Sequence, residues 1–105
     1  MQPSREIELV LTIENNTSPG NRYVVGSGGA VIGRDHSRAE VVIGDALVSR
    51  VHARVERVAE GFMIVNLTDA NHVYVNGNEV QRALLKDGDL LRLGGSDLRV
   101  KIHRR

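Results

Sequence analysis

In the stretch Leu47-Val48-Ser49-Arg50-Val51-His52-Ala53, the polar pair Ser49-Arg50 is followed by an alternating pattern. Apolar residues occupy positions 51, 53 and 55, and polar residues occupy the positions between them. Strict alternation of this kind is typical of a half-buried β-strand. The pattern therefore predicts a strand that starts near Val51. It places Ser49 and Arg50 in the loop before that strand, where both side chains can point out of the fold.

Two shorter blocks, one before and one after this stretch, also lie beside apolar, strand-like runs. Gly33-Arg34-Asp35 follows the apolar residues 30–32, so the apolar run ends where the arginine begins. Val75-Asn76-Gly77 ends another strand-like run, and Asn-Gly is the strongest short-range signal for a hairpin turn. The three blocks thus predict three polar loops, each directly beside a strand.

The rest of the chain repeats this pattern of short strands and turns. Turn-forming residues recur roughly every 8–12 positions, and no helical stripe of ten or more residues interrupts them. This spacing predicts an all-β fold, either a sandwich or a barrel. The expected strands cover residues 7–14, 22–25, 30–33, 41–43, 51–56, 62–65, 72–75, 90–93 and 98–102.

The composition fits one small domain with an aliphatic core. A chain of 105 residues is too short for two cores, so we expect one domain over residues 1–105 with its core between about 7 and 103. Hydrophobic residues make up 41% of the chain, yet Tyr 2, Phe 1 and Trp 0 leave the core to Val, Ile, Leu and Ala. Cysteine is absent, which excludes disulfides, thiolate metal sites and cysteine nucleophiles.

Charge and hydropathy exclude several classes of partner. The formal net charge of +1 is too small for the electrostatic footprint of a duplex-binding protein. So few aromatic residues cannot form a convincing stacking platform for a single strand. No apolar run approaches the roughly 20 residues that span a bilayer, and no signal-peptide pattern opens the chain. We therefore expect no nucleic-acid partner, no membrane insertion and a cytoplasmic location.

Taken together, the three blocks resemble the core signature of the forkhead-associated (FHA) domain family over about residues 9–102. In that family a Gly-Arg pair, a Ser-x-x-His segment and an Asn-Gly pair lie on neighbouring loops of a β-sandwich that binds phosphothreonine. The resemblance implies a two-sheet antiparallel β-sandwich of the forkhead-associated type, with its first and last strands close together. Such a domain is easily inserted into larger proteins, and the abrupt start and finish of the chain favour an excised module over the alternative of a free-standing small protein.

The resemblance implies which residues meet the ligand. Phosphothreonine carries nearly two negative charges and three acceptor oxygens, so its receptor needs several donors and at least one guanidinium. Arg34 is expected to contact the phosphate, Ser49 to donate its hydroxyl to a phosphate oxygen, and Arg50 to add a second cation. Asn71, five residues before Asn76, matches the position whose amide bonds the peptide backbone beside the phosphothreonine.

A second set of residues is expected to hold the site in shape. The resemblance gives His52 an architectural role, in which its imidazole hydrogen-bonds within the loops. Gly33, Asn76 and Gly77 are expected to brace the same loops. From the residues alone, Asn76-Gly77 predicts only a turn, because both residue types tolerate positive φ.

Leu47 and residues 69–73 set this chain apart from the family pattern. Leu47 stands where members select the third residue after the phosphothreonine, and its apolar side chain predicts a preference for an aliphatic residue there. Asp69 adds a negative charge, Ala70 lacks a hydroxyl that often supplements phosphate binding, and His72 replaces a glycine. These departures predict weaker binding than in a typical member.

Three classes of function follow from these observations. The leading hypothesis is a phosphothreonine-dependent interaction module in signalling, whose partner is a threonine-phosphorylated protein or a segment of its own parent protein. The alternative is an FHA-like assembly domain that interacts without phosphate, which the altered residues 69–73 favour. An enzyme is disfavoured, because Gly-x-Ser-x-Gly, Walker and His-Glu-x-x-His signatures are all missing. A zinc site from His36, His52 and His72 fits no common ligand spacing, so we expect no metal and no cofactor.

Overall fold

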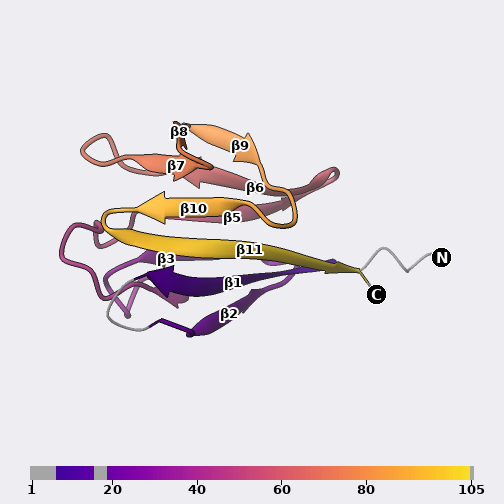
Figure 1. Cartoon of the computed structure of the whole chain (residues 1–105), viewed down its shortest axis with the longest axis horizontal. Helices are drawn as coiled ribbons and strands as arrows, with labels where there is room; N and C mark the ends of the chain where they lie inside the picture. Colours follow the sequence, from indigo (N-terminus) through magenta and orange to yellow (C-terminus); the bar gives the residue numbers. More distant parts are fainter. Residues whose placement is uncertain (1–6, 16–18, 105) are drawn as a thin grey trace.

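Eleven strands lie within residues 7–15 and 19–104, the part of the chain that the computed structural model describes. They form two stacked sheets, which confirms the expected all-β sandwich (Figure 1). The six-stranded sheet has the order β2 (Arg22–Val25), β1 (Ile7–Asn15), β11 (Ser96–Arg104), β10 (Leu90–Leu93), β7 (Val73–Val75) and β8 (Asn78–Glu79). The five-stranded sheet has the order β4 (Val41–Val42), β3 (Ala30–Gly33), β5 (Ala53–Val58), β6 (Gly61–Asn66) and β9 (Arg82–Leu84).

Aliphatic side chains fill the space between the two sheets. In β1 the alternating residues Leu9, Leu11 and Ile13 are buried, as the sequence pattern predicts. From the other sheet, Phe62 and Ile64 of β6 join the same buried cluster. Full burial of one such side chain is worth about 1.5–3 kcal/mol, so the sheets form a rigid base for the loops that join them.

The first and last strands pair along their length. β1 and β11 run antiparallel from the pair Ile7 and Arg104, so the start of β1 and the end of β11 lie side by side (Figure 1). This confirms the expected closeness of the terminal strands. Since β11 has nine residues and a strand rises about 3.3 Å per residue, the β10–β11 turn lies about 30 Å from the end of β11.

Several strand bounds differ from the sequence-based expectation by one or two residues, and three differences bear on the site or the topology. β5 starts at Ala53, two residues later than expected, so His52 lies before the strand. β8 and β9 were not predicted, because they are short and their residues do not alternate. β3 and β4 pair in parallel, with Ile32 beside Val41, so the sandwich is not purely antiparallel. No helix in the described ranges is long and apolar enough to cross a membrane.

Candidate functional site

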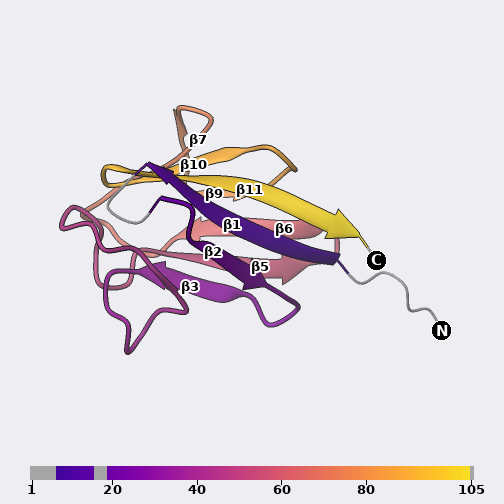
Figure 2. The ribbon, with the colours of Figure 1, turned by 60° about the horizontal axis from the view of Figure 1, so that its bottom comes forward.

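Three loops meet at the end of the sandwich that lies opposite the start of β1 and the end of β11 (Figure 2). They are the β3–β4 loop (residues 34–40), the β4–β5 loop (residues 43–52) and the β6–β7 loop (residues 67–72). We call them the site loops. Backbone and side-chain hydrogen bonds connect all three, so side chains far apart in the sequence lie on one surface.

Gly33 brings the first two site loops into backbone contact. The Arg34 N–H donates to the carbonyl oxygen of Ser49 at 3.0 Å, and the Asp35 N–H donates to that of Arg50 at 3.2 Å. A Cβ atom at position 33 would overlap the Arg50 carbonyl, so the close approach requires glycine. This contact fixes the points at which the Arg34 and Arg50 side chains leave the sandwich.

The Arg34 side chain is exposed and held at one nitrogen. Its Nε donates to the carbonyl oxygen of Val48 at 2.9 Å, which anchors the guanidinium against the β4–β5 loop. Within the described residues, its two terminal nitrogens have no hydrogen bond or ion pair. Arg34 is therefore oriented and still has donors for an anion.

Ser49 and Asn71 are joined directly. The Asn71 Nδ2 donates to the Ser49 Oγ, although 22 residues separate them in the chain. A hydroxyl accepts and donates, so the Ser49 proton remains available to a ligand. Arg50, next to Ser49, is exposed and forms no side-chain ion pair with any described residue. The structure thus gathers the four predicted ligand-binding residues around these loops.

His52 is fully buried and connects two of the site loops. The Ser49 N–H donates to its Nδ1 at 3.1 Å, and its Nε2 lies 2.9 Å from the carbonyl oxygen of His72. Since Nδ1 accepts a hydrogen bond, Nε2 carries the proton and donates to His72. Burial lowers the pKa of His52 below its ordinary value, which favours this neutral form.

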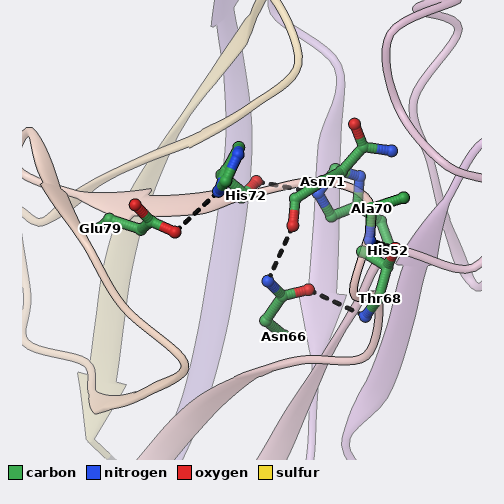
Figure 3. A network of polar contacts seen from close by, with 7 residues as sticks. All are labelled: His52, Asn66, Thr68, Ala70, Asn71, His72 and Glu79. Carbon is green, nitrogen blue, oxygen red and sulfur yellow. Dashed lines mark hydrogen bonds and ion pairs between the residues drawn. The ribbon is translucent and has the colours of Figure 1, made fainter.

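A chain of side-chain contacts shapes the β6–β7 loop around Asn71 (Figure 3). The Asn66 Nδ2 donates to the carbonyl oxygen of Asn71 at 3.0 Å, and the Asn66 Oδ1 accepts the Thr68 N–H at 3.0 Å. The Thr68 hydroxyl accepts the Ala70 N–H, also at 3.0 Å. These bonds hold the backbone of Asn71, while its side chain is held by Ser49.

Sequence reasoning missed Asp45, which ties the β4–β5 loop to the β10–β11 turn. Its Oδ1 accepts the Leu47 N–H, and its Oδ2 accepts the Ser96 hydroxyl and the Gly95 N–H, each at 2.8 Å. Burial raises the pKa of Asp45, but these donors outweigh it and the net shift is downward. The bond to the Leu47 N–H could have been predicted, because aspartate commonly accepts a hydrogen bond from the backbone two residues later in a turn. The bond to Ser96 could not, because the two residues are 51 positions apart in the sequence.

Asn76 and Gly77 form the predicted hairpin turn but lie apart from the site loops. Their φ angles of 52° and 86° give a tight turn between β7 and β8, which confirms the turn prediction. The Asn76 Nδ2 donates to Asp89 at 2.9 Å, and its Oδ1 accepts the Leu90 N–H at 3.0 Å. Among the described residues, no hydrogen bond joins Asn76 to Ser49. The side chain of Asn76 therefore braces the turn before β10.

The described ranges contain no group of three or more His, Cys, Asp or Glu side chains that could hold a metal ion. Two of the three histidines considered for zinc use their ring nitrogens in other contacts. His52 is enclosed between two loops, and His72 pairs with Glu79 through contact of Nδ1 and Oε2 at 2.7 Å.

Comparison with known proteins gives consistent matches. The model of a family described as FHA domain matches residues 30–94. The chain is 31% identical over 93 residues to FHA domain-containing protein FhaA of Mycobacterium tuberculosis (strain ATCC 25618 / H37Rv). This match covers 89% of the chain and 18% of FhaA, so the chain spans less than a fifth of that relative.

Two solved structures share the fold and about the same identity. One comes from a structural and functional analysis of phosphothreonine-dependent FHA domain interactions. It has a TM-score of 0.83 and 30% identity, over 93% of this chain and 99% of that chain. The other is the FhaA FHA domain complexed with the intracellular domain of Rv3910. It has a TM-score of 0.79 and 30% identity, over 89% and 99% of the two chains.

Proposed function

The chain belongs to the FHA domain family, and we propose that it binds threonine-phosphorylated peptides through the site loops. The observation that carries this proposal is the joined set of Arg34, Ser49 and Asn71, which three separate loops bring onto one surface. Arg34 is oriented by Val48 and keeps free donors. A preorganised guanidinium beside a hydroxyl is suited to a dianionic phosphate.

Each group has a distinct role in this proposal. Arg34 and Arg50 supply charge, and the Ser49 hydroxyl donates to a phosphate oxygen. The Asn71 amide nitrogen is engaged by Ser49, so its oxygen remains to accept an N–H of the peptide backbone. Hydrogen bonds to charged groups are worth about 1.5–3 kcal/mol each, so a few of them can anchor a short peptide.

The domain then acts as a recruitment module without catalysis of its own. The partner is a threonine-phosphorylated protein, or a phosphorylated segment of the protein that carries this domain, in a cytoplasmic signalling setting. A related FHA domain has been solved with the intracellular domain of Rv3910, which supports a protein partner. The adjacent ends of β1 and β11 suit a module carried within a larger protein.

Calorimetry with one phosphothreonine peptide and its unphosphorylated twin tests the function. A degenerate phosphothreonine library supplies the peptide. We expect binding of the phosphorylated form only, and about tenfold or greater weakening by Arg34→Ala or Ser49→Ala with little change in melting temperature. Arg54→Ala, which removes an exposed arginine from β5, is the matched control and should bind normally.

The same titrations distinguish the alternative of assembly without phosphate. Equal binding of both peptides, or normal binding by the Arg34→Ala variant, would contradict the site. Self-association of the domain with no response to either peptide would favour the assembly role.

A further inference from the structure

The loops around Ser49 carry charged side chains of both signs. Arg34 and Arg50 extend from the β3–β4 and β4–β5 loops. The β6–β7 loop, which reaches Ser49 through Asn71, exposes Asp69 two residues before Asn71. No ion pair within the described residues joins Asp69 to an arginine, so its negative charge is not neutralised at contact distance.

The β6–β7 loop holds Asp69 at its tip in a fixed position. The residues on both sides are bonded, because Thr68 donates to Asn66 and accepts from Ala70, and Asn66 also holds the Asn71 carbonyl (Figure 3). The Asp69 side chain is exposed and, within the described ranges, accepts no hydrogen bond. This carboxylate is therefore placed by its neighbours and available to a ligand.

The distance from Asp69 to the site is short. Two residues of chain span at most about 7 Å, so Asp69 lies within that distance of Asn71 along the backbone. The Debye length at physiological ionic strength is about 8 Å, so Asp69 acts on charges bound beside Asn71. Glu79 of β8, by contrast, is paired with His72 at 2.7 Å.

We propose that Asp69 is a specificity residue that selects a basic side chain within three residues of the phosphothreonine. This inference rests on the proposed function and extends it to a preference for positive charge in the peptide near the phosphothreonine. A lysine or arginine of the bound peptide meets the unpaired Asp69 carboxylate. The same carboxylate opposes the phosphate, so peptides without a basic residue bind more weakly than the arginines alone would allow.

A peptide series tests this inference. Phosphothreonine peptides with alanine at all flanking positions are compared with peptides that carry one arginine at each of the three positions before and after the phosphothreonine. We expect one position at which arginine tightens binding about threefold or more, in the range of an exposed ion pair. In Asp69→Asn this preference disappears, and the all-alanine peptide binds more tightly than to the unmodified domain.

Glu60→Gln is the matched control. It removes one exposed negative charge in the β5–β6 turn, about 20 Å from the β6–β7 loop along the six residues of β6. This variant should keep the arginine preference. An arginine preference that survives in Asp69→Asn, or no preference at any position, would overturn the inference while phosphothreonine binding itself persists. If the unmodified domain binds no phosphothreonine peptide at all, the proposed function is refuted, and this inference with it.

Discussion

At the scale of single residues, His52 holds two of the site loops together from a buried position. Both of its ring nitrogens are used, one by the Ser49 N–H and the other by the His72 carbonyl. A buried polar side chain is costly unless such bonds are made, so its complete burial depends on the neutral tautomer. Protonation at Nδ1 would remove the acceptor that positions Ser49.

This arrangement predicts a loss of stability in mild acid. Burial lowers the pKa of folded His52 below about 6.5, the value of the unfolded chain, so the unfolded state takes up the proton more readily. The contribution of His52 to stability is complete above pH of about 6.5 and is lost as pH falls below that value through the folded pKa. Melting curves between pH 7.5 and 5 and NMR titration of the imidazole measure both effects. A folded His52 pKa at or above its ordinary value would contradict this account.

Leu47 predicts selectivity beyond the phosphate. Its backbone is held by Asp45 and its side chain is 67% exposed, so apolar surface is available at the edge of the β4–β5 loop. Peptides with Ile, Leu or Val three residues after the phosphothreonine should bind several-fold better than those with Asp, since each buried CH₂ group is worth about 0.8 kcal/mol. A peptide array varying only that position measures this. Leu47→Arg should reverse the order, and an Asp optimum in the unmodified domain would show that Leu47 does not face the peptide.

At the scale of elements, the contact between β3 and the β4–β5 loop depends on Gly33. Gly33→Ala forces the Arg50 carbonyl away, and overpacking of this kind costs about 1–3 kcal/mol. We expect a lower urea midpoint and at least tenfold weaker phosphopeptide binding, because the exits of Arg34 and Arg50 both shift. Gly26→Ala is the control, since nothing lies within 4 Å of the added Cβ. If the two variants unfold and bind alike, the contact does not position the site.

Local sequence patterns predicted the strands and turns better than the contacts between side chains far apart in the sequence. Alternation located β1 and β11, and Asn76-Gly77 predicted its turn, because both signals depend only on neighbouring residues. His52 sits at a polar position of an alternating run, and that local pattern does not predict its burial; only the family resemblance implied its architectural role. Its burial depends on carbonyl and N–H partners from two loops. The bond between Asp45 and Ser96 likewise exists only once the sheets have formed.

At the scale of the whole molecule, the site loops lie far from the paired ends of β1 and β11. The start of β1 lies beside the end of β11, and the Asp45 contact with Gly95 places the β4–β5 loop at the opposite end, beside the β10–β11 turn (Figures 1 and 2). A peptide bound at the site loops would therefore lie about 30 Å from the end of β11, given the nine residues of that strand.

An NMR titration with a phosphothreonine peptide tests most directly whether the three loops form one phosphopeptide site. We predict that the backbone amides of Arg34, Ser49, Arg50 and Asn71 shift most, and that the unphosphorylated peptide shifts none of them. Amides at the opposite end of the sandwich, such as Glu60, should remain unchanged. The largest shifts on the outer face of β7 and β10, around Tyr74, or equal shifts with both peptides, would contradict the account.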